Sequence, residues 1–130
     1  MKRNILVIII VAILAIISIF EELTVKDVTT RIGAYAGALE SDINQNEENI
    51  NVSSVKDTFE NLSGYWDSKK THICFFANYD KIRYMDENMI KLNDAIKDND
   101  MALAKENLSS VKSFGLLIQY VMGFNINNLF

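Results

Sequence analysis

ILVIIIVAILAIISIF is the stretch from Ile5 to Phe20, and none of its sixteen residues carries a charge. It directly follows the basic start Met1-Lys2-Arg3-Asn4. At about 1.5 Å per residue, a helix of this length covers roughly 24 Å of a hydrocarbon core about 30 Å thick. Flanking side chains that reach toward the headgroups close the difference. The stretch is therefore predicted to be a membrane helix or a signal peptide, because it has no polar face to offer a soluble protein.

The residues at the end of this apolar run favour an uncleaved anchor over a cleaved signal. Signal cleavage requires small residues on the N-terminal side of the cut, in an A-x-A-like pattern. A cut after Ser18 would put Ile16 in that pattern, and a cut after Ala15 would fall inside the apolar run. The only cysteine, Cys74, lies far from the run, which excludes a lipoprotein signal. We therefore expect residues 1–22 to form a membrane anchor, with a cleaved signal as the alternative.

The charges that flank the run predict its orientation. Lys2 and Arg3 precede it, whereas Glu21 and Glu22 follow it. The positive-inside rule keeps the basic end in the cytoplasm. The expected location is the cell membrane, crossed once, with a cytoplasmic N-terminus and an extracytoplasmic domain formed by residues 23–130.

The remainder of the chain has the composition of one small helical domain. Among the 130 residues there are five glycines and no proline, too few turn-forming residues for a strand-rich domain. The whole chain has 13 basic and 17 acidic residues, and only 11 basic residues remain once Lys2 and Arg3 are left out. This balance argues against nucleic acid as a partner, because such binding needs clustered lysine and arginine. A single cysteine excludes an internal disulfide.

Apolar residues recur at intervals of three and four in four blocks, as expected for one buried face on each of four helices. The first block follows the apolar run without a break, so the anchor and this block are expected to form one rod of about forty residues, roughly 55–60 Å long. Gly33 and Gly37 are expected to give this rod a thin packing surface for another helix. The blocks are Val25, Val28, Ile32, Tyr35 and Leu39; Val52, Val55, Phe59, Leu62 and Trp66; Ile82, Met85, Met89, Leu92 and Ile96; and Ala104, Leu108, Val111, Gly115, Ile118 and Met122.

Short polar segments between the blocks predict that neighbouring helices run antiparallel. Residues 44–49 form the clearest loop, and Asp98-Asn99-Asp100 is expected to be a turn that caps the helix after it. The boundary between Thr71 and Asp80 stays undefined, since it contains neither glycine nor proline. The predicted fold is all-α: an N-terminal transmembrane helix that continues into an antiparallel three- or four-helix bundle.

Side chains suited to catalysis or metal binding are few and poorly spaced. His72 and Cys74 are two positions apart, so a helix would point them about 200° from each other. They cannot share a metal or act together as base and nucleophile. No glycine-rich phosphate loop and no Gly-x-Ser-x-Gly motif occurs. We therefore expect no catalytic residues, no metal ligands and no cofactor, and we do not expect an enzyme.

Aromatic residues gather between positions 65 and 84. Four of them, Trp66, Phe75, Phe76 and Tyr79, are candidates for an exposed surface that contacts a protein partner or the membrane interface. The alternative is that these side chains fill the core beneath the boundary between the second and third helices. Their exposure in the folded protein decides between the two.

Several segments taken together resemble a family of short bacterial proteins that carries a domain of unknown function and is found largely in spore-forming Firmicutes. The resemblance covers nearly the whole chain and implies a membrane-anchored helical bundle without an established activity or catalytic residues. The segments are the basic, isoleucine-rich start, Trp66 in the second helix, Lys81-Ile82-Arg83-Tyr84-Met85-Asp86-Glu87, the Asn99-Asp100 turn and Asn127-Asn128-Leu129-Phe130.

The sequence thus favours a structural or protein-interaction module of the bacterial envelope, attached to the membrane through its N-terminal helix. The expected partners are the membrane, through that helix, and a protein of unknown identity. The alternative is a secreted helical bundle that, after signal cleavage, binds an apolar or amphipathic ligand between its helices.

Overall fold

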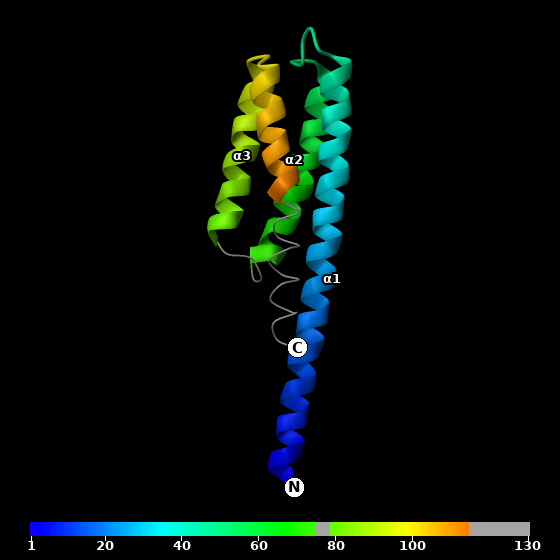
Figure 1. The fold of residues 1–130 in the computed structure, drawn as a ribbon, viewed down its shortest axis with the longest axis vertical. Helices are drawn as coiled ribbons and strands as arrows, with labels where there is room; N and C mark the ends of the chain where they lie inside the picture. The colour runs from blue at the N-terminus through cyan, green and yellow to red at the C-terminus, as the bar shows by residue number, and fades with distance from the viewer. Residues whose placement is uncertain (75–78, 115–130) are drawn as a thin grey trace.

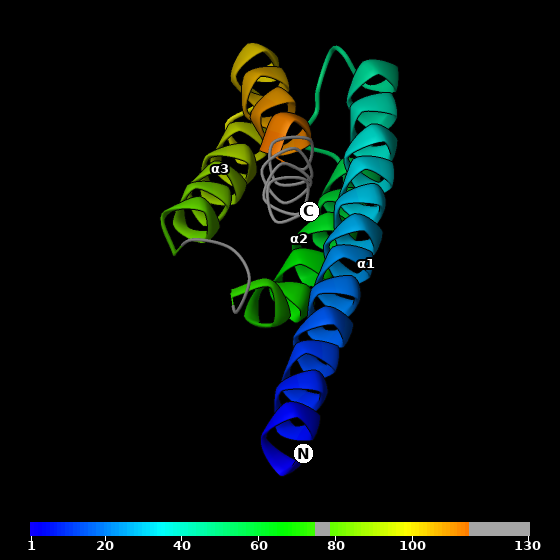
Figure 2. The same cartoon turned by 60° about the horizontal axis from the view of Figure 1, so that its bottom comes forward.

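The computed structural model describes residues 1–74 and 79–114, which form helices joined by turns (Figure 1). Helix α1 spans Lys2–Gln45, α2 spans Ser53–Cys74 and α3 spans Tyr79–Lys97. A fourth helix covers residues 101–114. Successive helices run antiparallel and enclose one interior, as the two views in Figures 1 and 2 show. The predicted all-α bundle is confirmed, with four helices and with no strand in the described residues.

Helix α1 is a single rod of 44 residues. At about 1.5 Å per residue it is roughly 66 Å long, which confirms the prediction of one long helix. Its buried positions begin at Val25, and the apolar half below that residue extends away from the bundle (Figure 1). Within that half, the Ser18 and Thr24 hydroxyls donate to main-chain carbonyls four residues earlier, at 2.9 and 2.8 Å. These polar groups are satisfied within the helix, as a helix in lipid requires.

The upper half of α1 packs against α2 with a stripe that differs slightly from the predicted one. Tyr35 is only half-buried, and Ala36 occupies the fully buried position beside it. The expected packing surface at Gly33 and Gly37 is wrong, because a Cβ added at either glycine would meet no atom within 4 Å. Ala36 is the small residue that lies fully buried on the packed face of α1.

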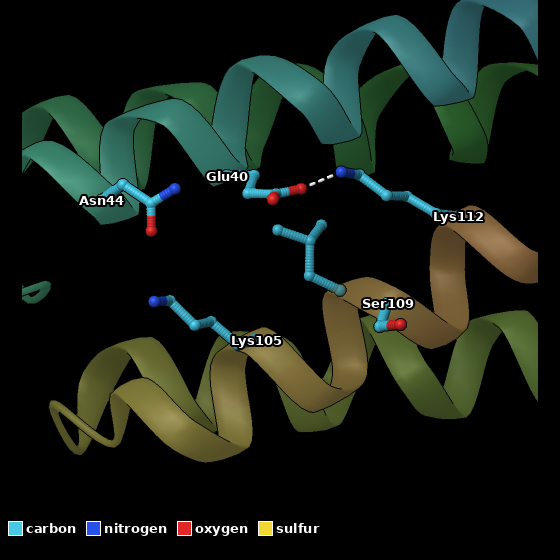
Figure 3. Close-up of a pocket in the computed structure, with 6 residues that line it drawn as sticks. Glu40, Asn44, Lys105, Ser109 and Lys112 are labelled. Atoms are coloured by element: carbon cyan, nitrogen blue, oxygen red, sulfur yellow. Dashed lines mark hydrogen bonds and ion pairs between the residues drawn. The ribbon is translucent and has the colours of Figure 1, made fainter.

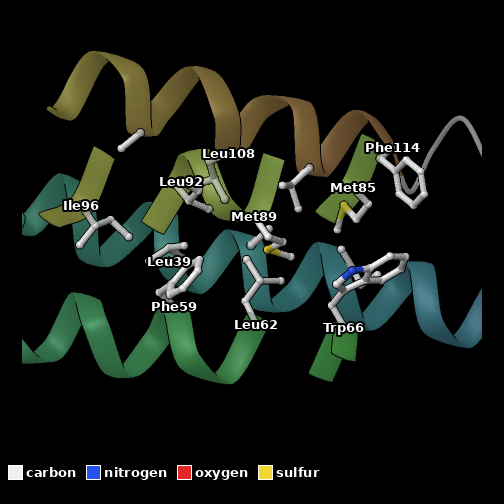
Figure 4. Packing of buried hydrophobic residues seen from close by; sticks show 14 of the residues in the cluster. Leu39, Phe59, Leu62, Trp66, Met85, Met89, Leu92, Ile96, Leu108 and Phe114 are labelled. Carbon is white, nitrogen blue, oxygen red and sulfur yellow. The ribbon is translucent and has the colours of Figure 1, made fainter. Parts of the chain in front are cut away.

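The stripes of the other helices lie where the sequence predicts them, except that Val52 precedes α2 and is only half-buried. Val55, Phe59, Leu62 and Trp66 are buried on α2, and all five predicted residues are buried on α3. The fourth helix buries Ala104, Leu108 and Val111, whereas Gly115, Ile118 and Met122 lie outside the described residues. Figure 4 shows side chains from all four helices meeting in one layered core. Burial of these apolar faces supplies most of the stability of such a bundle.

The turn at residues 98–100 closes α3 and opens the fourth helix. Asn99 has a φ of +53°, the left-handed conformation that asparagine tolerates at a helix end. The Asp100 N–H donates to the Ala95 carbonyl at 2.8 Å, and the Asn99 N–H donates to Ile96 at 3.2 Å, which is the Schellman pattern. The Asp100 carboxylate then accepts from the Leu103 N–H at 3.1 Å. The predicted turn and cap are confirmed.

This turn is also tied to the loop between α1 and α2. The Asn99 Oδ1 accepts a hydrogen bond from the Ile50 N–H at 2.8 Å. Beside it, the side-chain amide Nδ2 of Asn51 donates to the Lys97 carbonyl at 3.2 Å. We call this end the distal end of the bundle, since it lies farthest from the apolar half of α1 (Figure 1). The two hydrogen bonds join the loop between α1 and α2 to the turn between α3 and the fourth helix.

Substitution of Asn99 is expected to separate the contribution of its backbone from that of its side chain. Asn99→Gly keeps the left-handed conformation but leaves the Ile50 N–H unpaired, at a cost of about 1–3 kcal/mol. Asn99→Ala loses the same bond and adds backbone strain of about 1 kcal/mol. Thermal unfolding of the full chain in detergent micelles, followed by circular dichroism, checks this order. Equal melting temperatures for both variants and the wild type would contradict the described turn.

Candidate interaction surfaces

Trp66 does not lie on the surface. Its side chain is 1% exposed, so its assignment to an exposed contact surface is wrong. The indole Nε1–H donates to Asp86 Oδ1 at 2.7 Å, and the indole ring meets the ring of Phe114 edge-on at 5.8 Å. The apolar stripe of α2 thus carries Trp66 inward, while Asp86 satisfies its one polar atom. Trp66 ties α2 to α3 and to the fourth helix.

Tyr79 is the one predicted contact residue that the described part of the chain shows to be exposed. It is the first residue of α3 and is 68% exposed. Phe75 and Phe76 lie outside the described residues. Tyr84, which was not singled out, is 49% exposed, and its ring stacks at 6.4 Å on Phe114. Its place between the buried Ile82 and Met85 is the sequence signal that could have revealed it.

These exposed aromatic residues belong to the lower part of the bundle. Helix α2 ends and α3 begins at the end of the bundle nearest the apolar half of α1 (Figure 1). We call this end the base of the bundle. On α2 it presents His72, which is exposed, and on α3 it presents Tyr79. Thr71 and Asp80 are exposed beside them, so the base presents aromatic, polar and charged side chains.

A line of charged groups joins α2 and α3 above the base. Lys70 Nζ lies 3.3 Å from Asp67 Oδ1 and 3.6 Å from Asp86 Oδ1. Burial lowers the pKa of the Lys70 ammonium, but its bonds to Asp67 and Asp86 outweigh this, and the pKa is raised overall. Asp86 thus accepts a hydrogen bond from Trp66 and forms an ion pair with Lys70. This arrangement stabilises the contact between the two helices.

Two shallow hollows follow the α2–α3 face, with volumes of about 320 and 410 Å³. Phe59 and Asn93 line both of them, so the hollows adjoin each other. Their floor includes Met89 and Ile96, and Ile90 stands exposed at the edge. The rims carry lysine and carboxylate side chains of both signs. This face offers a mixed groove without a preference for one charge.

A third hollow, of about 320 Å³, separates α1 from the fourth helix. Figure 3 shows Lys112 reaching across it to form an ion pair with Glu40, while Lys105 extends toward the side where Asn44 lies. The pair links the two helices. Lys105, which also lines the hollow, could attract a small anion.

Metal-binding geometry is not found in residues 1–74 and 79–114. No group of three or more histidine, cysteine, aspartate or glutamate side chains in that part of the chain could hold an ion. The only histidine, His72, is exposed near the end of α2.

One buried hydroxyl is left without a partner among the described residues. The Tyr65 Oη is inaccessible to solvent and makes no hydrogen bond there. Its ring packs on Tyr35 of α1, with ring centroids 5.1 Å apart. Burial raises the pKa of the Tyr65 phenol, and the Asp27 carboxylate nearby adds to the rise. Both effects disfavour the charged form of Tyr65.

The substitution Tyr65→Phe is expected to leave the stability equal to that of the wild type, or about 1 kcal/mol higher, because it removes an unpaired buried hydroxyl. The raised pKa adds a pH signature. The wild type keeps full stability below the unfolded phenol pKa of about 10 and loses some as the pH rises through the folded value. Thermal melts between pH 7 and 11 should show a smaller alkaline loss in the variant. Tyr35→Phe controls for removal of a phenol, and a marked destabilisation by Tyr65→Phe would reveal a missed partner.

The fold and these surfaces together define a class: an all-α four-helix bundle extended by one helix that is long and apolar enough to cross a membrane. The model of a family described as a domain of unknown function, DUF4363, matches residues 28–129. The chain belongs to this family. The match begins just after the first buried residue, Val25, and leaves out the apolar half of α1. No curated protein and no solved structure matches the chain.

Proposed function

We propose that this protein is a single-pass, membrane-anchored helical bundle that acts as a structural or protein-interaction module of the bacterial envelope. In this proposal residues 1–22 anchor the chain, the N-terminus is cytoplasmic and the bundle is extracytoplasmic. A partner protein, whose identity is open, would bind the bundle. The proposal includes no enzymatic activity, no cofactor and no nucleic acid partner.

The observation that carries the proposal is that none of the residues the structure describes covers the apolar half of α1. An 18-residue window of this helix is apolar enough to cross a membrane, and none of it is buried within the protein. Its large side chains between Ile5 and Leu23 are about half exposed or more. In water this surface would aggregate, whereas a bilayer would cover it. The lysine and arginine before the run, and the glutamates after it, support the proposed orientation.

An interaction or structural role rests on what the bundle exposes. The grooves and the base present apolar and charged side chains of the kind that contact other molecules. Its histidine and its carboxylates do not converge on one cleft in the described residues. A secreted, ligand-binding bundle would need an enclosed apolar cavity between the helices, and the hollows found here are shallow and rimmed by charge.

Three measurements on native cells test the proposal. Alkaline extraction should leave the protein in the membrane pellet, and intact mass should include residues 1–22. Protease added to spheroplasts should digest the bundle without lysis, which reports the orientation. Crosslinking and pull-down from these membranes should then recover the same partner repeatedly. A soluble protein shortened by about two kilodaltons would instead support signal cleavage.

A further inference from the structure

We propose that the base of the bundle rests on phospholipid headgroups, and that Lys69, Tyr79 and Lys81 form this contact. The inference rests on the membrane anchoring proposed above, and it adds a second contact with the bilayer. The partner is chemically the phosphate layer of the leaflet that α1 enters. The contact would hold the bundle upright and point its distal end away from the membrane.

The distance along α1 leaves no room for a gap between bundle and bilayer. The charge-free run ends at Phe20, and the first buried residue of the bundle is Val25. Five residues of helix cover only about 7.5 Å. The headgroup region on each side of a bilayer is about 5–8 Å thick. The base therefore lies within or directly on the headgroup region.

No hinge separates the two parts of α1. The helix is continuous from Lys2 to Gln45, and the residues between Phe20 and Val25 include neither glycine nor proline. The Thr24 hydroxyl donates to the Phe20 carbonyl at 2.8 Å, across this segment. The bundle must therefore follow the tilt of the membrane-spanning half. A base contact would restrict that tilt further.

The side chains at the base suit a phosphate layer. Tyr79 is exposed, and tyrosine is enriched where one end of a ring is apolar and the other is wet. Lys69 and Lys81 form no ion pair with the described residues, in contrast to Lys70 and Arg83, which do. Long lysine side chains can extend their ammonium groups to lipid phosphates. Each lysine near a charged membrane surface shifts binding about fivefold.

Charge is distributed unevenly along the bundle in the direction that this contact needs. On α2 and α3, residues 67–74 and 79–83 contain four basic and two acidic residues, and residues 21–31 of α1, where the bundle begins, add two basic and three acidic ones. Residues 40–60, around the distal end, contain six acidic residues and one basic residue. The acidic end is repelled by phosphate, while the basic end is attracted. This difference in charge between the two ends favours the upright orientation.

The test uses the full chain in lipid nanodiscs, with Cys74→Ser and one nitroxide label. The label sits at the base in Thr71→Cys, or at the distal end in Glu48→Cys, and both residues are exposed in the native protein. Nickel chelated by headgroup-modified lipid relaxes nearby labels. We expect relaxation at position 71 at least fivefold greater than at position 48. Lys69→Gln with Lys81→Gln should then reduce it roughly twofold or more.

Lys56→Gln with Lys97→Gln at the distal end is the matched control and should leave relaxation at position 71 unchanged, with circular dichroism reporting that each variant is folded. Equal relaxation at positions 71 and 48 would overturn the proposal. Unchanged relaxation at position 71 in the variant with Lys69→Gln and Lys81→Gln would also overturn it, because α1 alone would then hold the base near the bilayer. A chain that does not co-elute with nanodiscs overturns the anchor itself, which is a distinguishable result. A protein crosslinked to position 71 in native membranes, with no headgroup relaxation, would assign the base to a protein partner.

Discussion

Trp66→Ala is expected to lower the free energy of unfolding of the bundle by about 3–5 kcal/mol, the usual cost of removing a large buried aromatic side chain. The site has little means of collapse, because Trp66 fills the space between α2, α3 and the fourth helix. Domains of this size are stable by only about 5–15 kcal/mol in total. A large part of the population should therefore unfold at moderate denaturant concentration.

Trp66→Phe distinguishes the contribution of the ring to stability from that of its hydrogen bond. The smaller ring keeps most of the apolar contact with Phe114 but leaves Asp86 without its indole donor. A loss of about 1–3 kcal/mol is expected, clearly smaller than for alanine. Urea titration of the full chain in micelles, with helicity as the signal, gives both values. If Trp66→Ala unfolds at the same urea concentration as the wild type, Trp66 is not part of the core.

Ile9→Lys combined with Ile13→Lys is expected to remove the protein from the membrane. A lysine near the middle of a membrane helix costs about 2.5–3.5 kcal/mol on the insertion scale, so two shift the equilibrium by more than about a thousandfold. Both side chains are exposed in the protein and touch no core residue, so the bundle should keep its melting temperature. Loss from the membrane without loss of folding is the specific signature.

Ile9→Leu combined with Ile13→Leu is the matched control and should stay in the membrane. The measurement is the fraction of protein in the pellet after alkaline extraction, with a circular dichroism melt of each purified variant. A dilysine protein that remains fully in the pellet would show that residues 5–20 do not hold it there.

The periodic part of the fold could be predicted from the sequence because burial imposes it locally. Intervals of three and four residues predicted the buried faces of α2 and α3 and much of the buried face of α1. Asp98-Asn99-Asp100 predicted a turn, because turn formation depends on these few adjacent residues. The unbroken apolar run gave the long α1 helix for the same reason. What these features share is that neighbouring residues alone decide them.

Contacts between distant parts of the chain could not be predicted this way. The bond from Ile50 to Asn99 and the ion pair of Lys112 with Glu40 depend on how the helices are placed against one another. The same limit explains the error at Trp66: an aromatic cluster in sequence does not show which rings the helix turns inward. Tyr79 is exposed because it begins α3 outside the buried stripe, which starts at Ile82.

The central claim is that one rigid helix joins the membrane to the bundle, and a distance within α1 tests it most directly. Two nitroxides are placed by Leu14→Cys and Ser41→Cys, with Cys74→Ser, in the full chain reconstituted in nanodiscs. Both residues are exposed, and 27 helical steps separate them. Double electron–electron resonance should give one narrow distribution near 40 Å. A broad distribution, or one centred well below that distance, would mean that α1 bends or breaks between the bilayer and the bundle.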